Sequence, residues 1–271
     1  MKPAAFEYAR PQTVAEAVAM LAGRLDAKIL AGGQTLGPML NLRLAQPGLL
    51  VDITRIPELA AVTEDAEAVT IGATVTHAAI EDGRIPDPTG GFLARVARGI
   101  GYRAVRTRGT IGGSLAHADP AADWLSCLTA LGADVLIAGA SGRRRLPLSN
   151  LVRGAMESDL EPDELITGIR VPKFSPRARF GFHKICRKAG EFADAIGVVV
   201  DDPERNYFRA VCGATSGRPL VMEMRTDSGP KTLTIDQAQN LLKLAHFSGD
   251  DYDLKLHAVA LQRAYREAYA A

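Results

Sequence analysis

Apolar positions in the first two thirds of the chain fall into short runs with strand or helix spacing. Residues 14–21 place their apolar side chains on one face of a helix, behind Thr13 and Glu16, which have the spacing of a capping box. Strands are predicted at residues 27–30, 49–53, 69–71, 133–138 and 164–171, and helices at 38–44, 76–80 and 92–100. Residues 6–11 look extended, and residues 143–145 read as a basic turn. This mixture of strands and helices is typical of α/β units.

The pattern changes after Pro172. Three stretches alternate like antiparallel strands, at residues 180–185, 195–200 and 207–213, and two helices follow, at 235–244 and 253–269. Strands followed by helices favour a separate α+β unit. We therefore expect an α+β protein with one domain over residues 1–174. The remainder, residues 175–271, is expected to form a small domain with a three-stranded antiparallel sheet and helices.

Two glycine pairs are the most informative local motifs. Gly112 and Gly113 precede a predicted helix that Asp119 can cap, with Pro120 at its first position. A similar motif, residues 31–36, follows the predicted strand at 27–30. Adjacent glycines allow consecutive backbone N–H groups to converge on an anion, and neither motif has the lysine of a P-loop. An ordinary turn is the alternative for either pair, but together they could hold the two phosphates of one dinucleotide from opposite sides.

Asp123 and His117 are the polar candidates beside the second motif. Asp123 stands about one turn into the predicted helix. Its carboxylate could be favoured there by the helix N-terminus, or it could accept hydrogen bonds from the hydroxyls of a ligand. His117 could touch a ligand, although a single histidine is more often a structural residue.

Composition narrows the class of protein. The 271 residues are 47% hydrophobic and 23% charged, with a net charge of +1, so nothing favours nucleic acid or an anionic membrane as partner. No apolar run reaches the ~18 residues that a membrane span needs. Cys127, Cys186 and Cys212 are far apart and show no disulfide framework or metal-ligand spacing. The cysteines therefore predict a reducing compartment, the cytoplasm.

The two glycine motifs, in this order, resemble the flavin-binding motifs of the molybdenum hydroxylases. The similarity is to their FAD-binding medium subunit, the carbon monoxide dehydrogenase and xanthine dehydrogenase family, and it extends through residues 51–54, 72–77, 102–109 and 163–172. The resemblance covers the chain well up to about residue 200 and is weak beyond it. The resemblance implies a PCMH-type fold in which FAD lies between two α/β subdomains, with the C-terminal domain against the flavin ring.

The resemblance also implies a set of cofactor-binding residues. They are Ala31, Gly32, Gly33, Gln34, Thr35, Leu36, Thr110, Ile111, Gly112, Gly113, Ser114, Leu115, Asp123, Ile166 and Lys184. His183 is an alternative to Lys184 as the basic flavin contact, and Phe192 falls near an aromatic of the family at the flavin ring. No acid, base, nucleophile or metal ligand is expected, because FAD itself carries the redox chemistry.

The implied activity is that of an oxidoreductase subunit. It would take electrons from two [2Fe–2S] clusters of a small partner subunit to FAD and pass them to an external acceptor. A large partner would hold molybdopterin, and two such heterotrimers would pair. The alternatives are a free-standing flavoprotein oxidoreductase of the same fold and a non-catalytic nucleotide-binding module. The sequence leaves the substrate and the electron acceptor open.

Overall fold

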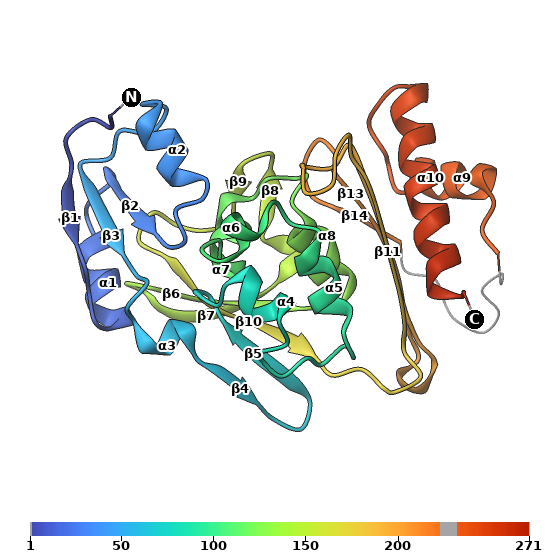
Figure 1. Cartoon of the computed structure of the whole chain (residues 1–271), viewed down its shortest axis with the longest axis horizontal. Helices are drawn as coiled ribbons and strands as arrows, with labels where there is room; N and C mark the ends of the chain where they lie inside the picture. The colour runs from blue at the N-terminus through green and yellow to red at the C-terminus, as the bar shows by residue number, and fades with distance from the viewer. Residues whose placement is uncertain (1, 223–231, 271) are drawn as a thin grey trace.

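Three main sheets follow one another along the longest axis of the molecule (Figure 1). The computed structural model describes residues 2–222 and 232–270. The expected α+β class is confirmed, since the first sheet is parallel and the other two are antiparallel.

The first sheet belongs to an N-terminal lobe. In spatial order its strands are β1 (Glu7–Ala9), β3 (Leu49–Asp52) and β2 (Ala27–Leu30). Helix α1 (Val14–Leu21) buries Val14, Ala17 and Leu21, and its N-cap Thr13 accepts a hydrogen bond from the N–H of Glu16. The predicted capping box is only half formed, because the side chain of Glu16 accepts from the N–H of Gln12 instead of Thr13. Helix α2 (Leu36–Asn41) follows the first glycine motif. The parallel arrangement brings the end of β2 directly to that motif.

The second sheet has five strands. In spatial order they are β4 (Val62–Glu64), β5 (Ala68–Gly72), β10 (Leu165–Pro172), β6 (Asp134–Gly139) and β7 (Gly142–Pro147). The helices around it are α3 (Pro57–Ala60), α4 (His77–Glu81), α5 (Phe92–Arg98), α6 (Arg103–Arg106), α7 (Ile111–His117) and α8 (Asp123–Ala130). A 3₁₀ turn, η1 (Leu148–Asn150), leads to the short pair β8 (Val152–Gly154) and β9 (Glu157–Ser158). Every residue of α8 is buried, so this helix lies at the centre of the core.

The third sheet stands between two layers of helix (Figure 1). Its strands are β11 (Arg179–Ile185), β12 (Ala195–Asp202), β13 (Tyr207–Gly213) and β14 (Leu220–Met222), with η2 (Pro203–Arg205) joining β12 to β13. Helix α8 lies against β12 and β13, and α10 (Asp251–Ala268), together with α9 (Ile235–Leu244), covers the other face. All of β12 is buried because it is covered from both sides.

The structure corrects the predicted position of the glycine pair and of the helix after it. Gly112 and Gly113 lie inside α7, whose N-cap Thr110 accepts from the N–H of Gly113 at 3.1 Å. Asp119 does not cap α8, because its carboxylate accepts instead from the N–H of Ala121, and α8 begins only at Asp123. A local turn thus takes up the capping side chain.

Two further expectations change at the sheets. Residues 143–145 were expected to form a turn, but they lie in the edge strand β7. Arg144 and Arg145 are held there by Glu164 on one side and Asp134 on the other. The C-terminal sheet has a fourth strand, β14, which is too short to carry a pattern. The predicted domain boundary near residue 174 stays a prediction. Side chains from both sides of it share one hydrophobic cluster, since Val198 and Val211 pack in the same cluster as Trp124.

Two glycines allow α10 to lie directly on the third sheet. A Cβ on Gly197 would overlap the carbonyl oxygen of Ala260, and one on Gly181 would overlap that of Ala264. We therefore expect Gly197→Ala to lower the free energy of unfolding by about 1–3 kcal/mol, measured by denaturant unfolding, because the helix must shift. Gly217→Ala is the control, since the nearest atom to its Cβ would be 3.9 Å away. An equal effect of the two substitutions would contradict the close contact.

Candidate functional site

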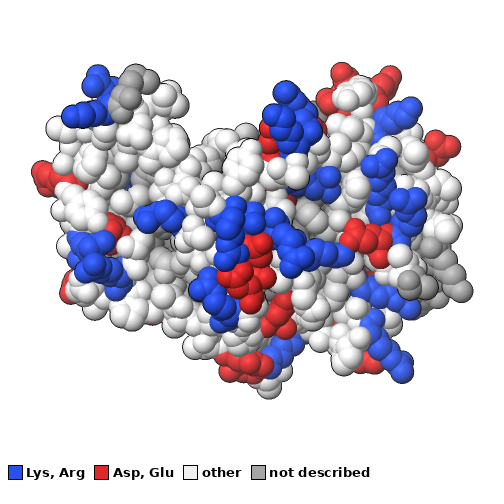
Figure 2. Space-filling model, viewed as in Figure 1, with Lys and Arg blue, Asp and Glu red and all other residues white. Residues whose placement is uncertain are grey.

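A cavity of about 570 Å³ separates the N-terminal lobe from the central sheet. Its walls come from the turn between β2 and α2, from α4, α7 and the start of α8, from β10 and from residues 100–105 and 190–192. Figure 2 shows a notch in the outline between the lobe and the rest of the molecule, with few charged side chains on its visible walls. The volume is typical of sites for small molecules and cofactors.

The first glycine motif lines this cavity along its whole length, residues 31–36. Gly33 has a left-handed backbone, with φ +71°. Among the residues that the structure describes, the N–H groups of Gly32, Gly33, Gln34 and Thr35 meet no hydrogen-bond acceptor. Consecutive free N–H groups around a left-handed residue form a concave site for an anion. The motif therefore fits the diphosphate of a dinucleotide cofactor.

The second motif contributes Thr110, Gly112, Gly113 and Ser114 to the wall. Gly112 is a glycine because of packing: a Cβ would lie 2.5 Å from the Cβ of Ala73 and 2.7 Å from its carbonyl oxygen. The N–H of Gly112 also donates to that oxygen at 2.9 Å. Gly113 is exposed and lies at the cavity. The N–H groups of both glycines thus have acceptors within the protein, since that of Gly113 donates to Thr110, and Gly113 is the exposed one of the pair.

The two motifs adjoin in space. A Cβ on Gly32 would overlap the carbonyl oxygen of Arg108, just before the second motif. A Cβ on Gly113 would lie 3.8 Å from that of Ala31. The absence of side chains at Gly32 and Gly113 thus lets segments nearly eighty residues apart form one continuous surface.

A buried ion pair stands at the end of the cavity where α8 begins. The two carboxylate oxygens of Asp123 lie 3.0 and 3.1 Å from Nζ of Lys184, which also donates to the carbonyl oxygen of Gly99 at 3.2 Å. Burial raises the pKa of Asp123, and the charge of Lys184 opposes this effect. Asp123 lines the cavity, whereas Lys184 lies behind it. Lys184 thus orients Asp123 and balances its charge.

The alternation of β11 separates Lys184 from His183. Nε2 of His183 lies 3.2 Å from Nη1 of Arg263 on α10, so His183 faces the helix that covers the far side of the sheet. Of the two basic candidates, only Lys184 is directed toward the cavity side.

Most of the residues implied by the resemblance meet at this cavity. Its wall includes Ala31, Gly32, Gly33, Gln34, Thr35, Leu36, Thr110, Gly112, Gly113, Ser114, Asp123 and Ile166. The side chains of Ile111 and Leu115 belong instead to the hydrophobic core, and Lys184 contacts Asp123 from behind. His117 and Phe192, which the sequence analysis named as further candidate contacts, also lie on the cavity wall.

Other residues of the cavity escaped sequence reasoning. They include Lys28, Met39, His77, Tyr102, Val105, Gly109, Leu160, Leu165 and Glu191. Tyr102 and Phe192 are 70% and 63% exposed, so they offer aromatic surface at the cavity. Residues 190–192 reach the cavity because the N–H of Gly101 donates to the carbonyl oxygen of Gly190 at 3.0 Å. Both residues have positive φ, which glycine adopts readily. In the sequence, the glycine at each place was the available signal for a turn.

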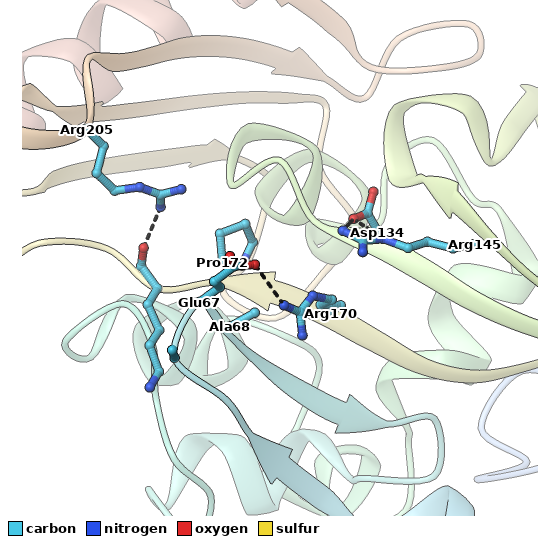
Figure 3. Close-up of a pocket in the computed structure, with 9 residues that line it drawn as sticks. Glu67, Ala68, Asp134, Arg145, Arg170, Pro172 and Arg205 are labelled. Carbon is cyan, nitrogen blue, oxygen red and sulfur yellow. Dashed lines mark hydrogen bonds and ion pairs between the residues drawn. The ribbon is translucent and has the colours of Figure 1, made fainter.

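A second pocket, of about 430 Å³, lies beside β5, β7 and β10 (Figure 3). Its arginines already have acceptors within the protein. Arg145 pairs with Asp134, Arg170 pairs with Asp65 and Glu67, and Arg205 donates to the carbonyl oxygen of Lys173. These contacts stabilise the junction between the sheets and offer little free charge to a ligand.

The described residues, 2–222 and 232–270, contain neither a metal-ligand cluster nor a membrane-spanning helix. No group of three or more His, Cys, Asp or Glu side chains in these ranges converges as metal ligands would. No described helix is both long enough and apolar enough to cross a bilayer.

His77 gives the cavity wall a pH-sensitive element. Burial, helped by the charge of Arg106, lowers its pKa from 6.5 to about 4. The unfolded chain binds a proton at this site below about pH 6.5, and the folded chain does not. We therefore expect the free energy of unfolding to fall by up to about 3 kcal/mol between pH 6.5 and pH 4 on account of His77.

The measurement is denaturant unfolding at several pH values. Nδ1 of His77 accepts from Nε1 of Trp124 at 3.1 Å, so the double variant His77→Phe, Trp124→Phe removes both partners and keeps two rings. This variant should lose the component of pH dependence assigned to His77, while the carboxylates continue to contribute. The same pH profile in both proteins would contradict the assignment.

The sequence is similar to a family of FAD-binding domains and to subunits of named dehydrogenases. A family model described as the FAD binding domain in molybdopterin dehydrogenase matches residues 4–174. The 6-hydroxypseudooxynicotine dehydrogenase complex subunit alpha of Paenarthrobacter nicotinovorans is 35% identical over 261 residues, which are 95% of this chain and 84% of the relative. The carbon monoxide dehydrogenase medium chain of Hydrogenophaga pseudoflava is 41% identical over 202 residues, 74% of this chain and 70% of the relative.

Solved structures agree over almost the whole length. Carbon monoxide dehydrogenase from Hydrogenophaga pseudoflava superposes with a TM-score of 0.88 at 33% identity, covering 99% of both chains. Quinoline 2-oxidoreductase from Pseudomonas putida 86 gives 0.86 at 30% identity, covering 99% of this chain and 98% of the other. These matches confirm the predicted PCMH-type fold, the FAD cofactor and the oxidoreductase class. The chain belongs to the FAD-binding medium subunits of the molybdenum hydroxylases.

Proposed function

We propose that this chain is the electron-transfer subunit of a heterotrimeric molybdenum hydroxylase. It would take electrons from two [2Fe–2S] clusters of a small partner subunit to FAD and on to an external acceptor. The observation that carries the proposal is a row of four residues on the cavity wall, Gly32 to Thr35, whose backbone N–H groups have no acceptor among the described residues. The three cysteines of the chain are fewer than the four thiolates that a [2Fe–2S] cluster takes, which favours clusters in a partner.

The residues of the cavity divide the binding of FAD between them. The N–H groups of the first motif would hold the diphosphate, and Gly113 and Ser114 would approach it from the adjoining second motif. Asp123 would accept hydrogen bonds from hydroxyls, with its orientation fixed by Lys184. Ile166 would present an apolar surface. FAD, when bound, supplies a centre that accepts and releases electrons.

The names of the relatives and the position of the cavity favour two partner subunits. Relatives are named as the medium chain of carbon monoxide dehydrogenase, in Hydrogenophaga pseudoflava, and as subunit beta of caffeine dehydrogenase, in Pseudomonas sp.. An iron–sulfur subunit would dock beside Tyr102 and Phe192, because these exposed aromatic side chains lie at the cavity. A molybdopterin subunit would complete the trimer, and two trimers would pair. The cytoplasmic location of the protein stays a prediction, based on its three widely spaced cysteines.

The test of the function is reduction of FAD with and without partners. The isolated chain, loaded with FAD, should not be reduced by an organic substrate of the complex, and adding the two partner subunits should allow rapid reduction. The absorbance of the oxidised flavin reports both states. Dithionite is the control, because it reduces bound FAD without partners. Rapid reduction of the lone chain by the substrate would favour a free-standing flavoprotein instead.

Gly113→Val should weaken FAD binding by at least about 10-fold while the protein remains folded. Its added side chain would occupy space beside Ala31, between the two motifs, and would also disturb the cap made by Thr110. Gly217→Val is the control, because it adds the same side chain outside the cavity, where a Cβ would meet no atom closer than 3.9 Å. Titration of the apo-protein with FAD gives both affinities. Gly112→Val is unsuitable here, since it clashes with Ala73 and should impair folding itself.

Asp123→Ala is expected to reduce stability as well as FAD affinity. It leaves the ammonium of Lys184 buried without its carboxylate, which costs about 3–5 kcal/mol. The double variant Asp123→Ala, Lys184→Met should recover much of that stability and still bind FAD about 1–3 kcal/mol more weakly than the wild type, if Asp123 accepts from the cofactor. Denaturant unfolding without FAD and titration with FAD separate the two effects. Wild-type affinity in the double variant would exclude a contact between Asp123 and FAD.

A further inference from the structure

His77 is a buried polar side chain on the cavity wall. It is the first residue of α4, it is 5% exposed, and it lines the cavity beside Gly109 and Thr110. Its own N–H donates to the carbonyl oxygen of Gly109 at 2.9 Å, so its backbone is fixed to the segment that leads into the second glycine motif. The ring therefore has a defined place next to the proposed FAD site.

The hydrogen bond from Trp124 determines which ring nitrogen of His77 carries the proton. The indole Nε1–H is only a donor, so Nδ1 of His77, 3.1 Å away, must be the unprotonated acceptor. In the neutral ring the proton is then on Nε2. Burial and the charge of Arg106 keep the pKa of His77 near 4, so the ring is neutral at physiological pH.

Nε2 is left as a donor without an acceptor. No acceptor for Nε2 of His77 exists among residues 2–222 and 232–270. The edge of the ring that carries Nε2 lies against Gly109, where a Cβ would come within 2.9 Å of Nε2 and of Cδ2. Gly109 lines the cavity too, and its lack of a side chain keeps this edge of the ring uncovered. Nε2–H is therefore a donor at the cavity wall without an acceptor in the described protein, and it is open to an acceptor from a ligand.

We propose that His77 binds the cofactor: its Nε2–H donates a hydrogen bond to an oxygen of FAD, and Trp124 acts as a positioning residue that fixes the donating tautomer. The inference rests on the proposed FAD site and adds a residue to it. A neutral donor recognises an acceptor oxygen without adding charge, whether that oxygen belongs to the diphosphate, the ribityl chain or the ring. His77 therefore complements the backbone N–H groups of the first motif.

The direct test is NMR of the ¹⁵N-histidine-labelled apo-protein. We expect the nitrogen shifts of His77 to report the Nε2–H tautomer, and the Nε2–H resonance to move when FAD is added. The single variant Trp124→Phe identifies the signal of His77, because it removes the hydrogen-bond partner of Nδ1. An Nδ1–H tautomer, or an Nε2–H resonance that FAD does not move, would overturn the proposal.

Affinity provides an independent measurement. Trp124→Phe keeps the His77 ring, whose Nε2 can still donate although its tautomer is no longer fixed. The double variant lacks this ring, so the pair differs in the proposed hydrogen bond. Titration with FAD should show binding about 10-fold weaker in the double variant than in Trp124→Phe. Equal affinity of the two variants would mean that water, not FAD, satisfies Nε2, and would overturn the proposal while leaving the FAD site intact. Failure of the wild-type apo-protein to bind FAD would instead refute the proposed function, and if the double variant does not fold, the NMR experiment still decides.

Discussion

The buried contact between Asp123 and Lys184 ties together the parts of the molecule that enclose the cavity. Asp123 begins α8 in the central unit, and Lys184 comes from β11 of the C-terminal sheet. Nζ of Lys184 also reaches the carbonyl oxygen of Gly99, which lies just before the segment that forms the outer wall. Removing either charge would leave the other buried without compensation, so the pair fixes the C-terminal sheet against the cavity.

Close approach of backbone to backbone forms the rest of the site. Gly32 contacts the carbonyl of Arg108, and Gly112 contacts Ala73. Each contact is possible because one partner has no side chain. The result is a surface with main-chain N–H groups, and we propose that these groups bind the diphosphate of the cofactor without a change in protonation. Such a surface suits a cofactor that must stay bound through many cycles of oxidation and reduction.

The division of work within the family follows from this arrangement. The cavity wall offers donors, three carboxylates and apolar side chains, but no arrangement of nucleophile and base among the described residues. The protein positions the cofactor, and the cofactor provides the redox chemistry. Exposed aromatic residues, Tyr102 and Phe192, stand where a partner could approach it.

The sequence by itself determined many of the helices and strands and the class of cofactor. Capping residues such as Thr13 and Thr234 and the alternation of residues 180–185 are local signals, which depend only on neighbours in the chain. The glycine motifs were recognisable because their order along the chain resembles that of one family. What local signals could not give was the position of Gly112 and Gly113 inside α7, since the cap made by Thr110 and the contact with Ala73 decide it.

Only the tertiary structure decided which polar groups share the cavity. Asp123 and Lys184 are 61 positions apart, and His77 and Trp124 are 47 apart, so no spacing in the sequence could pair them. Burial then sets their chemistry, because it raises the pKa of Asp123 and lowers that of His77. The sequence determined that a flavin would be bound, and the fold decided which side chains line the cavity and in which direction their pKa values shift, because desolvation and pairing arise only when distant segments meet.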